Sequence, residues 1–402
     1  MKNLVIKKST LYSFSIGLLT IAFVTFYFTD GLGKILRRGG SEFYRYSAFL
    51  KGFFEIFALG FSLIAVSKSK INILLGITML LFGFLIGQLF LSLNFKNLLF
   101  FENFNTLFKY FFPLIIALIA LNIIGFNQYP DKLFKYYKAI IILNSCLLIL
   151  GFLFDIEVLT TYSGPWRFGY DGLIFAQNEA TYIFIFAITT VYYRRFYLDI
   201  KEYFFWIVII PSIIVATKGV YLYLILLLLF HIFKRVSLRN ILAFGISFLV
   251  FGYFLFSSAI NKIFINSYNI FMYMYEREGL WGALLSGRGA YITEKLKPLI
   301  LEQWTIPNFI FGGQDVVSHY IEMGFLDLFL FFGIFGSILY LYIFYSIFKI
   351  ISFPKEFKLF FGISLAIIVA TAGHFFESGI AGLHFIFLIL MNRNLNNKLQ
   401  NA

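Results

Sequence analysis

The sequence is poor in charged residues and almost devoid of cysteine. Asp, Glu, Lys and Arg make up 13% of its 402 residues, whereas soluble domains carry about a quarter. Hydrophobic residues make up 60% of the chain, and its mean hydropathy is +0.85. This composition excludes an ordinary soluble domain and indicates an integral membrane protein. With Cys146 as its single cysteine, the chain has neither a disulfide framework nor a cysteine-based metal site.

Several motifs of soluble enzymes are also missing. The sequence contains no Walker loop, GxGxxG, GxSxG or HExxH, so nucleotide chemistry in the cytosol has no support. The net charge of +13 does not indicate nucleic-acid binding, because most basic residues lie in short loops between apolar runs. No Pro/Ser-rich linker or low-complexity tract divides the chain. We therefore expect a single integral membrane domain, residues 1–402.

Apolar runs long enough for a membrane helix follow one another along the chain. The first, 11–28, follows Lys7 and Lys8 as in a signal peptide, but it exceeds the usual apolar region and lacks a small-residue cleavage pattern. A spanning helix needs about twenty apolar residues, so we predict an all-α polytopic membrane protein with about 12 transmembrane helices. The predicted spans are 10–29, 48–66, 71–93, 111–126, 137–154, 179–193, 203–217, 219–233, 240–257, 322–348, 357–373 and 379–391.

Alternating loops differ in charge, which orients the chain. One set is basic, and the positive-inside rule places it in the cytoplasm with both termini. The opposite set is poor in basic residues: 155–178 holds only Arg167, and 374–378 holds none. The long polar segment 258–320, inserted between the ninth and tenth spans, therefore faces outward. The basic loops hold Lys68, Lys70, Lys132, Lys135, Lys138, Arg194, Arg195, Lys201, Lys234, Arg235, Arg239, Lys349, Lys355 and Lys358.

The loop 30–47 conflicts with this orientation. It should lie outside, yet it carries Lys34, Arg37, Arg38 and Arg45. Three explanations are open: the first span is misplaced, the cations hold an anionic headgroup, or the segment is interfacial and contacts lipid. The last is favoured.

Three cations at the predicted outer boundary have settings suited to a diphosphate. Arg167 lies in a turn before the span that opens with Asn178, a candidate helix cap and supporting residue. Arg288 lies in the flexible Ser286-Gly287-Arg288-Gly289, and Lys218 lies beside a predicted helix start at Gly219. An Arg fork donates two parallel hydrogen bonds to phosphate oxygens. The alternatives are a snorkelling interfacial Arg, a solvated loop Arg and an ordinary span boundary.

Acidic and histidine side chains mark the re-entering span. His319 and Glu322 share a face at helical spacing, and Glu322, partly desolvated, would have a raised pKa suited to a general base. Asp327, deeper in the span, must pair or line a wet cavity, unless it only bridges to a neighbouring helix. His374 and Glu377 lie three residues apart between the last two spans. Two ligands are too few for a metal site, so we predict a supporting hydrogen-bonded pair and no metal.

In their order and topology these motifs resemble the O-antigen polymerase and O-antigen ligase superfamily of bacterial polysaccharide assembly. The resemblance runs along nearly the whole chain and rests on short motifs. Lys218 stands where the family often has Arg, and Gly324 stands where it often has an acidic residue. The matching motifs are Arg167-Phe168-Gly169 before Gln177-Asn178, Thr217-Lys218-Gly219, Ser286-Gly287-Arg288, Gly312-Gly313, His319, Glu322-Met323-Gly324-Phe325-Leu326-Asp327 and Gly333-Ile334-Phe335-Gly336.

The resemblance implies a fold similar to C-type membrane glycosyltransferases. It also implies transfer, without metal or cofactor, of undecaprenyl-diphosphate-linked oligosaccharides at the outer face of the bacterial inner membrane. We expect a polymerase of O-antigen or capsule, with Arg167, Lys218 and Arg288 on the diphosphate and Glu322 or His319 as base. The expected partners are the lipid-linked oligosaccharide, membrane lipids and a chain-length regulator protein, and nucleic acid is not among them.

Other functions fit part of the sequence. A ligase that moves finished polymer to lipid A–core, in lipopolysaccharide assembly, would use the same cations and base. A flippase or other transporter would need charged residues along both sides of its path, whereas the candidates here gather on the predicted outer side. A scaffold for the assembly machinery would tolerate the loss of every named residue.

Overall fold

The computed structural model is all-helical over the residues it describes, and the only β contact among them is an isolated bridge between Thr160 and Tyr170. The described residues are 8–41, 46–64, 67–94, 100–124, 130–162, 168–235, 265, 268–269, 271–283, 285, 287–313 and 320–400. Their main helices are α1 (Lys8–Arg38), α2 (Tyr46–Ile64), α3 (Lys68–Asn94), α4 (Phe100–Ile124), α5 (Asp131–Phe154), α6 (Gln177–Phe196), α7 (Phe204–Ile214), α8 (Lys218–Arg235), α10 (Arg288–Tyr291), α11 (Ile306–Phe311), α13 (Gly324–Phe348), α14 (Lys355–Thr371) and α15 (Gly379–Gln400).

Among the described residues, six helices are long and apolar enough to cross a membrane, namely α1 to α5 and α13. Shorter apolar stretches lie at Phe204–Ile214 and Gly379–Asn392. Each predicted span overlaps a helix except 240–257, which lies outside the described residues. The first helix is longer than predicted, because α1 continues to Arg38. The all-helical class is thus confirmed, with helices of membrane-spanning length.

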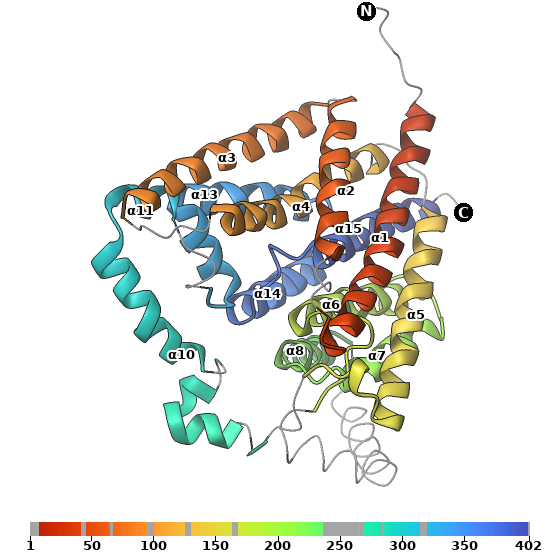
Figure 1. The fold of residues 1–402 in the computed structure, drawn as a ribbon. Helices are drawn as coiled ribbons and strands as arrows, with labels where there is room; N and C mark the ends of the chain where they lie inside the picture. Colours follow the sequence, from red (N-terminus) through yellow and green to blue (C-terminus); the bar gives the residue numbers. More distant parts are fainter. Residues whose placement is uncertain are drawn as a thin grey trace, which may run out of the picture.

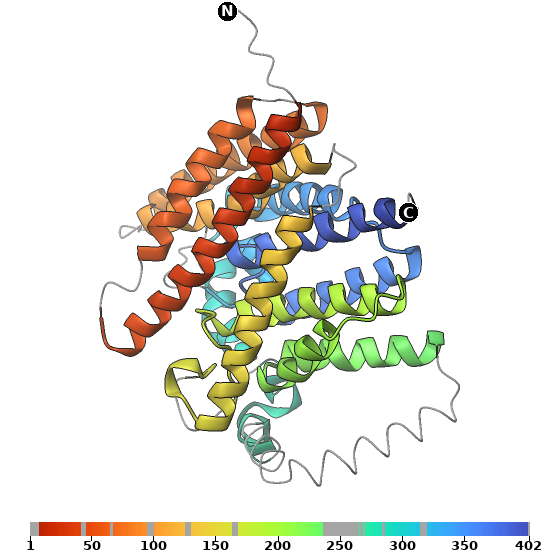
Figure 2. The ribbon, with the colours of Figure 1, turned by 90° about the vertical axis from the view of Figure 1, so that its right-hand side faces the viewer.

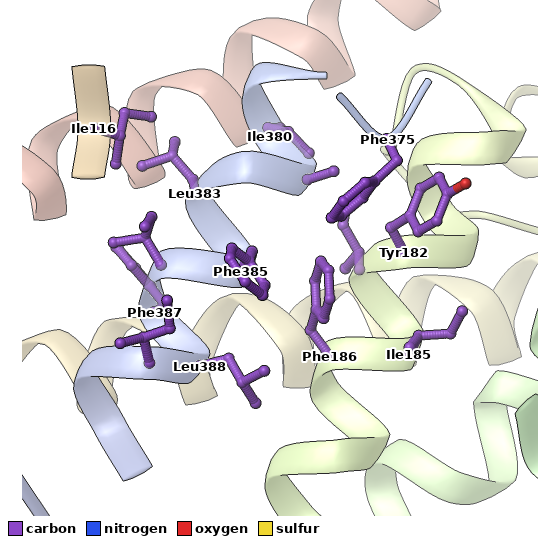
Figure 3. Close-up of a cluster of buried hydrophobic side chains, with 14 of the residues drawn as sticks. Ile116, Tyr182, Ile185, Phe186, Phe375, Ile380, Leu383, Phe385, Phe387 and Leu388 are labelled. Carbon is purple, nitrogen blue, oxygen red and sulfur yellow. The ribbon is translucent and has the colours of Figure 1, made fainter. Parts of the chain in front are cut away.

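The core of the molecule lies around residues 379–391 of α15, which are almost all apolar and therefore suited to complete burial. Helices α1, α4, α5 and α6 surround it, and Figure 2 shows α1 and α5 lying across it. In Figure 3, Leu383 points toward Ile116 of α4, while Phe385 packs with Phe186 of α6 at a ring distance of 5.7 Å. Between membrane helices, close packing of this kind supplies much of the cohesion.

Helix α13 is broken at Gly333, where the backbone has φ 66° and ψ −172°. Only glycine adopts this region readily. A Cβ atom at Gly333 would lie 2.4 Å from the carbonyl oxygen of Ile310 and 2.4 Å from the nitrogen of Gly312, at the end of α11. The break divides α13 into two arms (Figure 1), and the first arm begins at the candidate site.

The polar segment after α8 returns to the bundle through short helical pieces. Residues 271–283 are helical, and α10 and two π-type turns, Ile292–Leu296 and Leu299–Gln303, lead to α11. Figure 1 shows this part as an arm beside the main bundle, with α11 next to α3 and α13. A small apolar cluster attaches the arm to α13: Leu296, Leu299, Trp304, Ile321 and Leu330.

Candidate functional site

Arg288 and Glu322 form an ion pair where the polar segment meets the helix bundle. The Nη2 atom of Arg288 lies 2.8 Å from Oε2 of Glu322. Its Nη1 atom donates to the carbonyl oxygens of Leu285 at 3.4 Å and Thr371 at 3.3 Å. These contacts fix the guanidinium between α10, the approach to α13 and the end of α14. The two side chains keep 17% and 42% of their surface exposed, so an anionic ligand can reach the pair.

The two loops that carry this site have strained backbones. Glu322 has φ 62° and His374 has φ 68°, a left-handed conformation that residues other than glycine seldom adopt. Gly373 lies directly against Glu322, since a Cβ atom at 373 would be 2.7 Å from the Cα atom of Glu322. Such strain persists only where surrounding contacts enforce it, and it clusters at functional sites. The loop before α13 and the loop between α14 and α15 therefore form one fixed unit.

His374 stands between two carboxylates. Its Nδ1 atom is 2.8 Å from Oε1 of Glu377, and its Nε2 atom is 4.0 Å from Oε1 of Glu322. The hydroxyl of Tyr320 donates to Glu377 and lies 3.2 Å from Nδ1 of His374. The side chain of Glu377 is 9% exposed, and that of His374 is 32% exposed. Glu377 and Tyr320 thus hold the inner nitrogen, while the outer nitrogen faces the Arg288–Glu322 pair.

Burial sets the charge of these groups. It lowers the pKa of His374 below its usual range; Glu322 opposes this shift, while Lys109 and Arg288 add to it. Burial raises the pKa of Glu377 to about 7, where Lys109 opposes the rise and Glu179 increases it. At neutral pH the imidazole is therefore uncharged, and Glu377 is close to the midpoint of its titration.

Polar contacts continue from this site into the bundle. Ser378, next to Glu377, donates from its hydroxyl to Oε1 of Glu179 at 2.7 Å. The ammonium of Lys51 lies 2.7 Å from both carboxylate oxygens of Asp30, and Glu179 acts electrostatically on both residues. Helices α1, α2 and α6 and the loop before α15 thus bring charge to one interior region. Ionisable groups inside membrane helices usually mark function.

Lys218, a predicted ligand of the diphosphate, donates to the protein itself. Its Nζ atom lies 2.7 Å from the carbonyl oxygen of Ala283, in the helical segment before α10. Helix α8 begins at Lys218, one residue before the predicted start, and Thr217 accepts a hydrogen bond of 2.7 Å from Thr181 of α6. Lys218 therefore fastens the polar segment to the start of α8.

Asp327 caps the start of α13. Its two carboxylate oxygens accept hydrogen bonds from the backbone N–H groups of Ile321 at 2.9 Å and Met323 at 2.7 Å. This buried carboxylate therefore has a structural partner, and it does not need the bridge to another helix that we considered. Because α13 begins at Gly324, Glu322 precedes the helix. The prediction that Glu322 lies on a helical face is thus wrong.

Two of the predicted site residues, Arg167 and His319, lie outside the described residues. Asn178 was expected as a helix cap, but the cap position of α6 is Ala176, so Asn178 lies inside the first turn. The buried side-chain nitrogen of Asn178 has no hydrogen-bond partner among the described residues.

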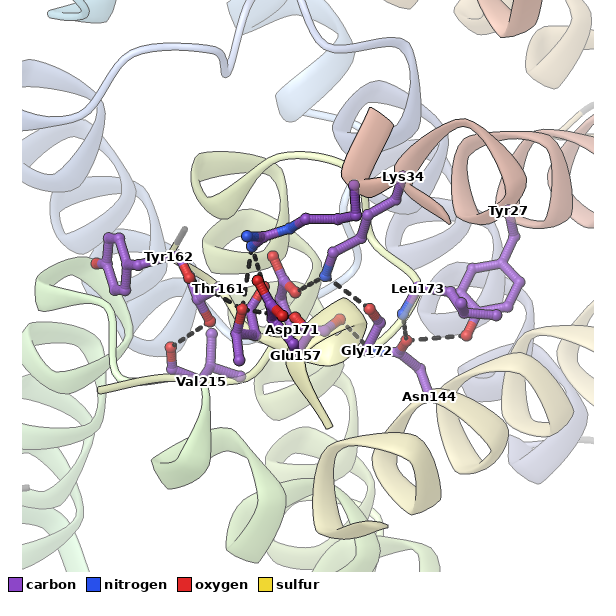
Figure 4. Close-up of polar contacts among 12 residues, drawn as sticks. Tyr27, Lys34, Asn144, Glu157, Thr161, Tyr162, Asp171, Gly172, Leu173 and Val215 are labelled. Carbon is purple, nitrogen blue, oxygen red and sulfur yellow. Dashed lines mark hydrogen bonds and ion pairs between the residues drawn. The ribbon is translucent and has the colours of Figure 1, made fainter. Parts of the chain in front are cut away.

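Lys34 and Arg38, predicted to lie in the loop 30–47, are in α1 and bind the loop after α5. Lys34, in the last turns of α1, forms a buried ion pair with Asp171 and donates to the carbonyl oxygen of Gly172 at 2.8 Å (Figure 4). Arg38 donates to the hydroxyl of Thr160 at 3.0 Å. The favoured interpretation, a segment in contact with lipid, is therefore wrong for Lys34. The end of α1 and the loop after α5 therefore lie together.

Further contacts hold the same two segments. The guanidinium of Arg37 lies 5.6 Å from the ring centre of Phe175. Asn144 of α5 accepts a hydrogen bond of 2.8 Å from Tyr27 and donates to the carbonyl of Asp171 at 3.1 Å. Arg45 lies outside the described residues.

Sequence reasoning missed three members of the site. Lys109 had a usable signal, since it is a cation inside a long apolar helix. Glu179 follows Asn178 directly, and only Asn178 was given a role, as a helix cap. Tyr320 gave no signal, because tyrosine occurs 26 times in the chain.

The site combines a guanidinium, carboxylates and an uncharged imidazole. No group of three or more His, Cys, Asp and Glu side chains in the described part of the chain is placed to hold a metal ion. The groups present are suited to binding an anion and to moving a proton.

Comparisons of this chain with protein-family models, with curated proteins and with solved structures found no match.

Proposed function

We propose that the chain is a membrane glycosyltransferase that joins undecaprenyl-diphosphate-linked oligosaccharide repeats into O-antigen or capsule polysaccharide. The observation that carries the proposal is the contact of Arg288, Glu322 and His374 at the edge of the polar segment. Glycosyl transfer from a lipid diphosphate needs a cation for the leaving group and an acceptor for the hydroxyl proton. Both occur here within one cluster that water can reach.

In this proposal Arg288 holds the diphosphate. Its terminal nitrogens already satisfy Glu322 and the carbonyl oxygen of Thr371, so phosphate oxygens would replace the carboxylate of Glu322. The exchange places the planar fork on the leaving group, where charge develops as the glycosidic bond breaks. Lys218 and Arg167 complete the set of cations.

The proposal includes the finer topology. We assign about 12 spans by apolar length, a fold similar to C-type glycosyltransferases, and a polar insertion at 258–320. Both termini would lie in the cytoplasm, with the site at the periplasmic face of a bacterial inner membrane. The partners would be the lipid-linked oligosaccharide, membrane lipids and a chain-length regulator. The contact between the end of α1 and the loop after α5 supports this arrangement, because both segments were assigned to the outer side.

Two other functions, a ligase and a transporter, can be tested alongside the proposed polymerase. A ligase would transfer finished polymer to lipid A–core and would use the same cluster. A transporter is favoured by one observation, the pairing of Lys51 with Asp30 inside the bundle near Glu179. Purified protein in sealed vesicles distinguishes them: a polymerase lengthens the oligosaccharide, a ligase moves it to lipid A–core, and a transporter changes its side without lengthening it.

The first prediction concerns Arg288. Purified protein in nanodiscs, supplied with lipid-linked repeat units, should lengthen them into a ladder on a gel. Arg288→Ala should reduce the rate by about 100- to 1,000-fold, because the leaving group loses its main donor. Arg288→Lys should recover only part of it, because an ammonium lacks the planar fork.

Arg277→Ala is the matched control. Arg277 lies on the same polar segment, is exposed, and contacts the hydroxyl of Tyr273 at 3.3 Å. It should elongate normally and bind undecaprenyl diphosphate like the wild type. A normal ladder from Arg288→Ala, or equal losses in both variants, would count against the proposal.

A further inference from the structure

The geometry points to His374 as the group that takes the proton of the attacking hydroxyl, with Glu377 as its positioning residue; this rests on the proposed function. Glu377 and Tyr320 lie on the Nδ1 side of the imidazole, at 2.8 Å and 3.2 Å. The other ring nitrogen, Nε2, lies 4.0 Å from Glu322, which is the ion-pair partner of Arg288. A carboxylate that accepts the Nδ1 proton fixes the tautomer and leaves the Nε2 lone pair for a substrate.

The predicted base, Glu322, is less suited to this role. Its carboxylate is engaged by Arg288 at 2.8 Å, and 42% of its side chain is exposed. Glu377 is also unsuited to direct contact, because its side chain is only 9% exposed and lies behind the imidazole. His374 is both reachable, at 32% exposure, and held from behind. Its positive φ of 68° is a second mark of a constrained functional position.

The step balances without a further reactant. The acceptor hydroxyl gives its proton to Nε2 of His374, and its oxygen forms the new bond to the anomeric carbon. The bond from that carbon to the diphosphate breaks, and its electron pair leaves with the diphosphate held by Arg288. The imidazolium then returns its proton to water or to the departing diphosphate.

The charge of the imidazole depends on all the groups that face it. Burial and the nearby cations keep it uncharged at neutral pH, as its lowered pKa indicates. Ionisation of Glu377, whose pKa is about 7, makes it an acceptor for Nδ1–H. Activity should therefore increase as the pH rises through about 7, and it should be low at more acidic pH, where Glu377 is protonated. The titratable and charged groups around the pair are Lys109 and Tyr110 from α4, Glu179 and Tyr182 from α6, Arg288 from α10, and Tyr320 and Glu322 before α13.

The second prediction uses chemical rescue. His374→Gly suits the left-handed backbone and leaves a space for a small base. Elongation by this variant should fall by about 100- to 10,000-fold in kcat, with little change in KM for the lipid-linked substrate. Added imidazole should restore activity in proportion to its uncharged form. His231→Ala, which removes a ring bound to the hydroxyl of Tyr192 near the far end of α8, should be insensitive to imidazole.

Glu377→Gln tests the positioning role. Its kcat should fall, and its pH–rate profile should lose the rise through about 7 that ionisation of Glu377 gives the wild type. Glu377→Asp should regain part of both. A residue that only stabilised the fold would not shift the profile.

The inference is overturned by near-normal kcat in His374→Gly, by a loss that imidazole does not restore, or by an unchanged profile in Glu377→Gln. The wild type separates this failure from that of the proposed function. If the wild type neither elongates nor ligates lipid-linked repeats, the proposed function fails. If it does so and His374→Gly matches it, only the inference fails.

Discussion

At the scale of single residues, the cation of the candidate site is already paired with a carboxylate of the same protein. Both terminal nitrogens of Arg288 already have partners, namely Glu322 and two backbone carbonyls. An anionic substrate must therefore compete with a carboxylate of the protein for the same guanidinium. The ion pair is partly exposed, so the cost of this exchange is small, on the order of 1 kcal/mol.

The third prediction follows from this competition. Glu322→Gln should bind undecaprenyl diphosphate about two- to fivefold more tightly, because a neutral amide gives up Arg288 more readily. Binding can be measured by titrating the diphosphate lipid into nanodiscs. Glu356→Gln is a suitable control, since Glu356 pairs with Lys234 on an exposed surface elsewhere. Weaker binding by Glu322→Gln would mean that the carboxylate assists the ligand directly.

At the scale of elements, the break in α13 decides where the site forms. Helix α11 ends against Gly333, and the first arm of α13 begins against the end of α14, where a Cβ atom at Gly324 would lie 2.8 Å from the side chain of Val369. A side chain at this position would meet backbone atoms, which cannot move aside as a flexible side chain can. The element therefore depends on one glycine.

The fourth prediction is that Gly333→Ala lowers stability by at least about 1–3 kcal/mol, the cost of a non-glycine residue in this backbone region. A fall in Tm in detergent would measure it. Gly60→Ala is the matched control, because a Cβ atom at Gly60 in α2 would meet nothing within 4 Å. That change should be neutral or stabilising by up to about 1 kcal/mol. Equal Tm values for the two variants would refute the role of Gly333.

Elements were the most predictable level of this structure. Apolar runs of membrane length predicted the helices, because the packed face and the outer face of a membrane helix are both apolar and leave a long unbroken pattern. The left-handed residues Glu322 and His374 could not be predicted, since neither is a residue type that marks such a turn. Nor could the pairing of Lys34 with Asp171 be predicted, because the charges of two segments far apart in the sequence do not show that the segments meet in the fold. The structure brings Arg288, Glu322 and His374 together, and their common place on the outer side stays a prediction.

At the scale of the whole molecule, the proposed orientation places the polar segment and the basic loops on opposite sides of a membrane. The candidate cluster joins α10, α13, α14 and α15, so it can work only if those ends share one compartment. The positions Glu302 on the polar segment and Glu356 at the start of α14 test this, because both side chains are exposed.

The fifth prediction is made in a background where Cys146 is replaced by Ser. In intact cells a membrane-impermeant maleimide should label Glu302→Cys fully. It should label Glu356→Cys only after the membrane is permeabilised. Labelling of both from outside, or of Glu356→Cys alone, would reverse or reject the orientation. Normal Tm values for both variants would ensure that the labelled protein is folded.

The ion pair between Lys34 and Asp171 has a consequence for biosynthesis. Its partners are separated by 137 residues, so the ribosome completes the lysine long before the aspartate exists. Until then the ammonium of a newly inserted first helix has to be solvated by water or by phospholipid. The ion pair can form only after the loop that follows α5 has been synthesised. The final position of the first helix is therefore fixed late in translation.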